Sequence, residues 1–312
     1  MVKMQDNNHK PQEISIEDLI SLILAKKYSI VISSLILIFL STVYLFITPN
    51  TYQSSATLMI NGSQQSLSDS LSQYSSLASF AGISIPSDSS QNRTDLAIET
   101  IRSKKFFDHI LRKHNLLPDI FAAKAYDLES KKIIYDSKLY DAKSKKWVRK
   151  PNFLNNVVPS TLEAYQQYMK SLSVYEDSKT GFIKISFNHV SPQFSNRMIN
   201  IIISELNFTT RAMETDRAKK SLSYLQNELK NTQESSIKSS IAALIQKELT
   251  TLMTANIDED YILQYIDQPF IPEKHIAPNR GTFLIISALI SLILSITIVF
   301  LRDVFFSKEF LK

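Results

Sequence analysis

Few residues of this chain stand at the spacings that enzymes use for metal binding or proton transfer. None of the histidines, His9, His109, His114, His189 and His275, belongs to an HExxH sequence. His109 and His114 are five residues apart, which would place them on different faces of a helix, so no shared zinc site is expected. The chain contains no cysteine, which excludes thiolate metal ligands and disulfides while remaining compatible with an oxidising compartment.

Nucleotide and acyl-transfer chemistry also lack their usual motifs. The glycines, Gly62, Gly82, Gly181 and Gly281, are too far apart to form a phosphate-binding loop or a dinucleotide fingerprint. There is no GxSxG sequence, and the carboxylate pair Glu259-Asp260 is typical of a solvated helix end. Carboxylates brought together in space for sugar chemistry stay open. We predict a non-catalytic protein that uses no cofactor and no metal.

Two long apolar segments are the strongest pattern in the chain. Residues 28–47 and 283–301 each run for about 20 residues without a charge, enough to cross a hydrocarbon core of about 30 Å. Buried core helices are usually shorter and carry a polar stripe. The first segment is too long for the apolar region of a signal peptide and lacks small residues at a cleavage site. We predict a transmembrane helix from each.

Basic residues indicate the orientation of these two segments. Lys26 and Lys27 precede the first, Arg302 and Lys308 follow the second, and residues 28–92 contain no lysine or arginine. The positive-inside rule therefore places both termini in the cytoplasm. The predicted order is a cytoplasmic tail (1–27), a transmembrane helix (28–47), a periplasmic domain (48–282), a second transmembrane helix (283–301) and a cytoplasmic tail (302–312).

The charge balance does not favour a nucleic-acid partner. The net charge is +5 and the pI is about 9.1, but acidic residues are interspersed with the basic ones. Residues 124–150 combine many lysines with tyrosines and a tryptophan. Such a mixture could bind an acidic glycan or a lipid phosphate, and the alternative is a solvated insertion.

The central domain has an α/β (α+β) pattern. Residues 52–60 alternate between apolar and polar types, and residues 171–176 and 182–189 flank a turn that contains Gly181, so we expect a hairpin that pairs with the first strand. Residues 94–115 predict one amphipathic helix. The remaining expectations are a membrane-face helix or an extended start of the first span (14–24), a mobile loop with one docked segment (63–92) and an extended segment (261–271).

A long helix is predicted in the second half of the chain. No proline or glycine lies between Pro192 and Pro269, which predicts one helix over about 193–257, or two in series. Its apolar stripes consist of Leu222, Leu225 and Leu229, followed by Ile237, Ile241 and Leu244. These narrow stripes suit packing between helices of neighbouring subunits, and the alternative is packing onto the same domain.

The second apolar segment carries small polar residues at helical spacing. Ser287, Ser291 and Ser295 are four residues apart, which places them on one face and permits close approach of another helix. The alternative is that each serine bonds back to its own backbone.

These features together resemble the Wzz-type polysaccharide co-polymerases, the chain-length determinants of O-antigen and related surface polysaccharides in Gram-negative bacteria. The most specific part is the segment with Pro269, Pro272 and Glu273, followed by Pro278 and Arg280 just before the second span. The other matching segments are Ile14–Leu19, Tyr52–Ile60, Glu99–Ser103, Ser191-Pro192 and Leu244–Asn256. Many relatives carry glycines in the second span where this chain carries serines.

The resemblance implies an α/β base with a long helix, assembled into a ring-like homo-oligomer in the inner membrane. It implies action with a Wzy-type polymerase on a lipid-linked polysaccharide, in contact with membrane lipid. The chain stops about ten residues after the second span, so it resembles the class without a fused kinase. An alternative is a two-span receptor or regulatory subunit that senses a periplasmic ligand, although its tails are short for signalling. A third is a periplasmic glycan hydrolase or transferase.

Overall fold

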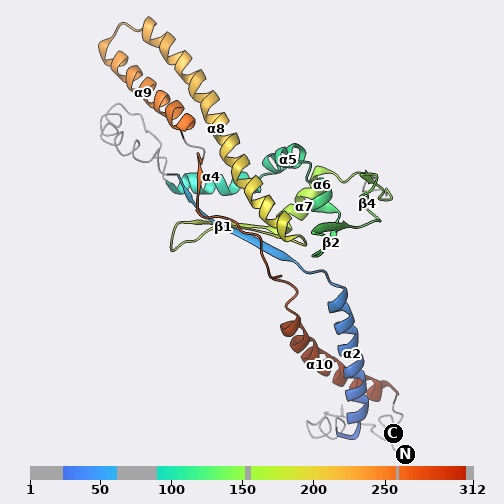
Figure 1. The fold of residues 1–312 in the computed structure, drawn as a ribbon. Helices are drawn as coiled ribbons and strands as arrows, with labels where there is room; N and C mark the ends of the chain where they lie inside the picture. Colours follow the sequence, from blue (N-terminus) through green and yellow to red (C-terminus); the bar gives the residue numbers. More distant parts are fainter. Residues whose placement is uncertain (1–23, 62–89, 152–155, 258–259, 307–312) are drawn as a thin grey trace, which may run out of the picture. The chain divides into compact units, whose positions relative to one another are not determined.

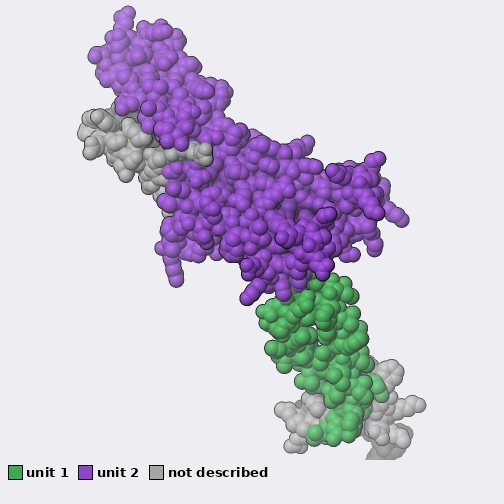
Figure 2. All heavy atoms as spheres, in the orientation of Figure 1, with its two compact units in different colours: residues 1–49, 277–312 green, residues 50–276 purple. Residues whose placement is uncertain are grey.

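The computed structural model describes residues 24–61, 90–151, 156–257 and 260–306. The chain divides into two compact units, residues 1–49 with 277–312, and residues 50–276 (Figure 2). Most of the predicted features at residues 14–24 and 63–92 lie outside the described residues.

The first unit contains two apolar helices, α2 (Lys27–Ile47) and α10 (Arg280–Phe306) (Figure 1). Both are long and apolar enough to cross a membrane, and they coincide with the predicted spans. Most of their large side chains are exposed, as expected of helices that face lipid. Asn279 caps α10, since its side-chain Oδ1 accepts from the Thr282 N–H at 3.4 Å.

The second unit is built on a four-stranded antiparallel sheet in the order β6-β7-β1-β8. The strands are β1 (Tyr52–Ile60), β6 (Leu172–Glu176), β7 (Ile183–His189) and β8 (Leu263–Asp267). Buried and partly buried residues alternate along β7, as expected of a strand with one more deeply covered face. Gly181, with φ of 70°, closes the turn between β6 and β7. The predicted hairpin and its pairing with the first strand are confirmed.

Helices cover this sheet, and one prediction about them is wrong. The helix expected at 94–115 is two helices, α4 (Ser90–Arg102) and α5 (Lys104–Lys113). Ser103 has extended backbone, and its hydroxyl accepts from the Phe106 N–H at 3.2 Å, so it begins a new helix. The other covering helices are α6 (Leu117–Phe121), α7 (Thr161–Ser171) and α8 (Pro192–Asn231).

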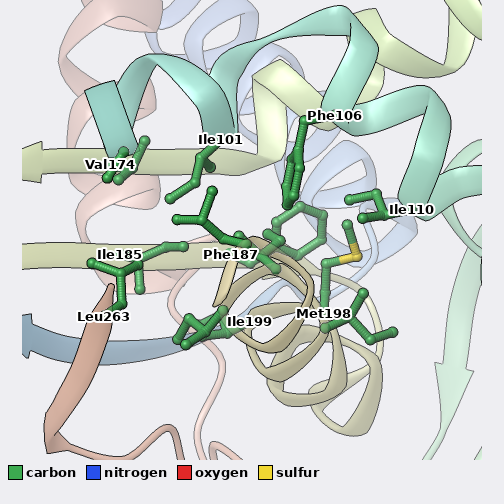
Figure 3. Close-up of a cluster of buried hydrophobic side chains, with 14 of the residues drawn as sticks. Ile101, Phe106, Ile110, Val174, Ile185, Phe187, Met198, Ile199 and Leu263 are labelled. Atoms are coloured by element: carbon green, nitrogen blue, oxygen red, sulfur yellow. The ribbon is translucent and has the colours of Figure 1, made fainter. Parts of the chain in front are cut away.

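The hydrophobic core lies between the sheet and these helices (Figure 3). Ile185 and Phe187 from β7 meet Met198 and Ile199 from α8, all buried almost completely. Tyr168 is buried beside them and donates its hydroxyl to the Ile101 carbonyl at 3.0 Å, which satisfies its polar group.

For residues 193–257 the sequence left one helix or two in series, and the structure has two, so the single-helix alternative is wrong. α8 ends at Asn231, and the chain reverses through residues 232–234 into α9 (Ser235–Ile257), which lies along α8 (Figure 1). Thr232 turns to extended backbone, and its hydroxyl donates to the Glu228 carbonyl at 2.8 Å. A threonine that bonds to the preceding turn can end a helix without glycine or proline.

Residues 123–147 form two small antiparallel hairpins. The first pairs β2 (Ala123–Asp127) with β3 (Lys132–Tyr135), and the second pairs β4 (Tyr140–Asp141) with β5 (Lys146–Trp147). Arg149, which follows the second hairpin, forms an ion pair with Glu163 of α7, with 2.7 Å between Nη1 and Oε1.

Candidate functional site

Hydroxyl groups join α2 to α10. Ser295 donates its hydroxyl to the Ile30 carbonyl at 2.7 Å and also contacts the Ser33 hydroxyl. The Oγ atoms of Ser34 and Ser291 are 3.3 Å apart. Ser291 and Ser295 are almost fully buried, so two of the three predicted serines lie against the other apolar helix.

Ser287, the third predicted serine, does not reach α2. It is partly buried and donates to the Leu284 carbonyl of its own helix, at 3.0 Å. Ser33 and Ser34, which the sequence analysis did not single out, supply the partner hydroxyls. Two adjacent serines within the first apolar segment were the feature of the sequence that could have identified them.

Aromatic groups join the same two helices nearer the other end of α2. The rings of Tyr44 and Phe283 stack with centroids 6.3 Å apart, and the Arg280 guanidinium lies 5.8 Å from the Phe46 ring centroid. From Ser34 to Tyr44 the partner positions run backwards along α10, so the pair is antiparallel and in contact over most of its length.

The proline segment, residues 269–273, is held by hydrogen bonds that side chains of the sheet unit donate to its backbone. Asn196 Nδ2 donates to the Pro269 carbonyl at 2.8 Å, and Ser54 donates its hydroxyl to the Phe270 carbonyl at 2.8 Å. Pro272 is buried. Because a proline nitrogen cannot donate, these carbonyl contacts hold the segment where a strand ladder would otherwise do so.

The other predicted residues of this motif differ from one another. Glu273 is exposed, whereas Pro278 and Arg280 belong to the unit of the apolar helices. The segment therefore serves as the ordered connection from the sheet unit to α10, and its buried and bonded residues have a structural role.

The predicted leucine and isoleucine stripes divide between two environments. Leu222 on α8 and Ile241 on α9 are each 8% exposed, covered within this chain because the two helices pack along each other. Leu225 and Leu229 are partly buried. Ile237 and Leu244 are 47% and 50% exposed.

Other large apolar side chains are also exposed on α9. Leu249, Met253 and Ile257, spaced four residues apart, lie on a different face of the helix from Ile237 and Leu244. Packing within the chain, one of the two alternatives left by the sequence, accounts for Leu222 and Ile241, while these exposed side chains are not covered by the described residues.

A charge cluster that sequence reasoning missed surrounds Glu205 of α8. The Glu205 side chain is 7% exposed, and Lys113 Nζ lies 2.8 Å and 2.9 Å from its two oxygens. His114 Nε2 lies 2.9 Å from Oε1, and His109 Nε2 lies 3.2 Å from Oε2. Burial acts to raise the pKa of Glu205, but the hydrogen bonds from Lys113, His114 and His109 outweigh it, and the pKa is lowered.

This cluster corrects the expectation that His109 and His114 face different directions. α5 ends at Lys113, and His114 has already left helical geometry, so the spacing rule for a continuous helix does not apply. The two rings converge on one carboxylate. Among the described residues, no group of three or more carboxylates and histidines is arranged to hold a metal ion.

Comparison with known proteins was made at the level of sequence families, curated sequences and solved structures. Residues 12–114 match the family model described as Wzz, chain length determinant protein. The match covers about a third of the chain, at its N-terminal end. The match spans α2, β1, α4 and α5, and it confirms the resemblance found in the sequence.

Solved structures give a more distant likeness. A full-length bacterial polysaccharide co-polymerase is 13% identical, with 95% of this chain and 99% of that chain covered and a TM-score of 0.41. A fragment of WzzB, a polysaccharide co-polymerase from Salmonella Typhimurium, is 11% identical, with 73% and 100% covered and a TM-score of 0.29. A search of curated protein sequences finds no significant match.

Proposed function

We propose that this protein is a non-catalytic regulator of the chain length of O-antigen or a related surface polysaccharide. The observation that carries the proposal is the match of residues 12–114 to the chain length determinant family. The match includes the first apolar helix and the first strand of the sheet unit, so it covers parts of both units.

The proposed setting is the bacterial inner membrane. α2 and α10 span it, both termini lie in the cytoplasm, and the sheet unit with its helical hairpin lies in the periplasm. The basic residues that flank the two apolar segments support this orientation.

The proposed partners are further copies of the same chain in a ring-like homo-oligomer, a Wzy-type polymerase and the lipid-linked polysaccharide. The exposed apolar side chains of α9 support the first of these, because exposed apolar side chains on a helix are stabilised by burial against a second surface; they are Ile237, Leu244, Leu249, Met253 and Ile257. Regulation then depends on assembly and contact with the polymerase, and requires no reactive group.

The proposal is tested by deleting the gene in the source organism and restoring it from a plasmid. The length distribution of the surface polysaccharide is read on a gel. Loss of a clustered distribution on deletion, with recovery on restoration, supports chain-length control. An unaltered profile contradicts it, and a change in a cytoplasmic partner that depends on a periplasmic ligand would support the receptor alternative.

A further inference from the structure

The two small hairpins are a sequence repeat. The segment Tyr126–Lys132 reads YDLESKK, and Tyr140–Lys146, 14 residues later, reads YDAKSKK. Each begins with tyrosine and aspartate and ends with serine and two lysines. The repeat therefore places the same chemistry twice within a short stretch.

The repeated residues adopt the same local geometry in both copies. Asp127 accepts from the Ser130 hydroxyl at 2.6 Å, and Asp141 accepts from the Ser144 hydroxyl at 2.6 Å. The first lysine of each pair has left-handed backbone, with φ of 53° and 55°. The aspartates are thus engaged within the turns, while the lysines that follow them are exposed.

Positive charge is concentrated in these hairpins. Residues 124–150 contain nine lysines and arginines against four aspartates and glutamates, a net charge of +5. The whole chain also has a net charge of +5, so the remainder is neutral on balance. Arg149 is paired with Glu163, and the exposed lysines of the segment are Lys124, Lys131, Lys132, Lys138, Lys143, Lys145, Lys146 and Lys150.

The aromatic rings of the hairpins pack on one another. Tyr140 and Trp147 have centroids 5.1 Å apart, Tyr135 and Tyr140 5.3 Å, and Phe121 and Trp147 6.2 Å. Tyr140 is buried and Trp147 is partly buried. These rings therefore contact one another and form a small core.

Apolar side chains accompany the lysines on the surface. Leu128, in the turn of the first hairpin, is 63% exposed, and Ile134 and Val148 are about half exposed. Exposed aliphatic groups among lysines suit the boundary between lipid headgroups and acyl chains, where the charge meets phosphate and the aliphatic group leaves water.

The hairpins are attached to one end of the central sheet. His189 of β7 pairs with Tyr52 of β1, and its Nε2 lies 2.9 Å from the carbonyl of Asp119 in α6. The Asp119 carboxylate accepts from the hydroxyl of Tyr135 in the first hairpin at 2.5 Å. Tyr52 begins β1 five residues after α2 ends, so this is the strand end at which the chain arrives from the apolar helix.

We propose that the paired hairpins of residues 124–150 bind the phosphate groups of anionic lipids in the membrane that α2 and α10 span. The inference rests on the membrane anchoring set out under Proposed function. The exposed lysines supply the charge, the aliphatic side chains contact the acyl boundary, and the chain joins the sheet unit covalently to α2. The packing of the aromatic rings on one another, with aliphatic side chains exposed instead, favours lipid over an acidic glycan.

Trp147 makes this surface directly measurable, because it is the single tryptophan of the chain. The full chain is reconstituted in nanodiscs of phosphatidylcholine, with or without phosphatidylglycerol, and part of the lipid carries brominated acyl chains that quench tryptophan on contact. We expect Trp147 emission at shorter wavelength and stronger quenching when phosphatidylglycerol is present. High salt should reduce both effects, because screening weakens exposed charge pairs.

The test variant combines Lys131→Asn, Lys132→Gln, Lys145→Asn and Lys146→Gln. Asparagine is chosen at the two left-handed positions because it tolerates that backbone. The matched control removes four exposed lysines from the helical hairpin, Lys219→Gln, Lys230→Gln, Lys238→Gln and Lys247→Gln. Equal emission of the test variant and the parent in detergent checks that the hairpins remain folded.

The lipid proposal requires loss of the anionic quenching in the test variant and its retention in the control. Equal quenching in both lipid compositions, or in parent and test variant, overturns it. A change in Trp147 emission caused by soluble polygalacturonate in neutral nanodiscs, without anionic quenching, also overturns it and indicates a glycan surface. Because the polysaccharide gel profile is not used, this proposal and the proposed function can fail separately.

Discussion

The two ends of α8 lie in different surroundings. Residues 192–207 contribute eleven of the thirteen buried residues of the helix, whereas residues 208–231 contribute Ala218 and Leu222. The first part packs on the sheet, and the second part is covered by α9 on one side only. We call these parts the base portion and the hairpin portion, the latter including α9.

Residues of the base portion stabilise the fold, whereas residues of the hairpin portion are available for interaction. Side chains of the base portion fill a closed core, so substitutions there act on folding. The hairpin portion keeps several exposed apolar side chains on α9, whose burial would require a second surface. The same helix therefore serves two purposes along its length.

The largest expected effect comes from the base. Phe187→Ala removes a ring that is 1% exposed in the centre of the core. We expect the free energy of unfolding to fall by about 3 to 5 kcal/mol, from lost apolar burial and the cavity left behind. Denaturant titration of the detergent-solubilised protein, followed by circular dichroism, measures it.

The matched control for this change is Tyr224→Ala on the hairpin portion, where the side chain is 64% exposed. Its expected effect on the free energy of unfolding is within about 0.5 kcal/mol. An equal fall in the free energy of unfolding for Phe187→Ala and Tyr224→Ala would contradict the distinction between the base portion and the hairpin portion.

A smaller and more local effect is expected within the hairpin. Leu222→Ala or Ile241→Ala should destabilise the packing of α9 on α8 by about 2 to 4 kcal/mol, because both side chains are buried there. Hydrogen exchange should accelerate in α9 and in the second part of α8, and remain unchanged in β7. Leu244→Ala, at an exposed position, is the control. Equal acceleration of hydrogen exchange in the sheet and in the hairpin would contradict the independent stability of the two portions.

Glu205 marks the boundary between the two portions and gives a pH signature. Glu205→Gln should lower the free energy of unfolding by about 1 to 3 kcal/mol at neutral pH, since hydrogen bonds to a buried charge are weakened. The pKa of Glu205 is lowered from 4.5 in the folded state, so its contribution is present above about pH 4.5 and is lost as the pH falls through the lowered value.

Denaturant titrations of parent and Glu205→Gln from neutral pH down to about pH 3 measure this contribution. The stability difference between the two proteins should shrink over the acidic end of that range. A difference independent of pH would show that the Glu205 charge does not stabilise the fold.

The smallest effect is expected between α2 and α10. Ser295→Ala should weaken their pairing by about 0.6 kcal/mol, the average for hydrogen bonds between helices in membranes. Because the chain has no cysteine, the pair Ser34→Cys with Ser291→Cys can report pairing through disulfide yield. The yield should fall slightly with Ser295→Ala and stay constant with Ser287→Ala, and little crosslinking of Ser34→Cys with Ser287→Cys is expected.

Much of the base could be predicted from the sequence because its elements obey local rules. Alternation gave the first strand at its observed bounds, 52–60, and the turn at Gly181 gave the hairpin. Long uncharged runs gave both apolar helices.

Errors arose where one polar side chain overrode a regular pattern. Ser103 caps a new helix inside an apolar period, and Thr232 ends α8 without glycine or proline. The Glu205 cluster depends on residues 91 to 96 positions away in the chain, which no local pattern can bring together. The division of the leucine and isoleucine stripes between buried and exposed positions follows from the reversal at residues 232–234, so it was equally inaccessible.

The most direct test of the account is the surface polysaccharide profile of a deletion strain restored with the double variant Ile237→Ser and Leu244→Ser. The control is restoration with Leu96→Ser and Leu162→Ser, which change equally exposed leucines outside the hairpin. With equal amounts of protein in the membrane, we expect the control to recover a clustered length distribution and the hairpin variant to lose it. Full recovery by the hairpin variant would contradict the assignment of length control to the exposed face of α9.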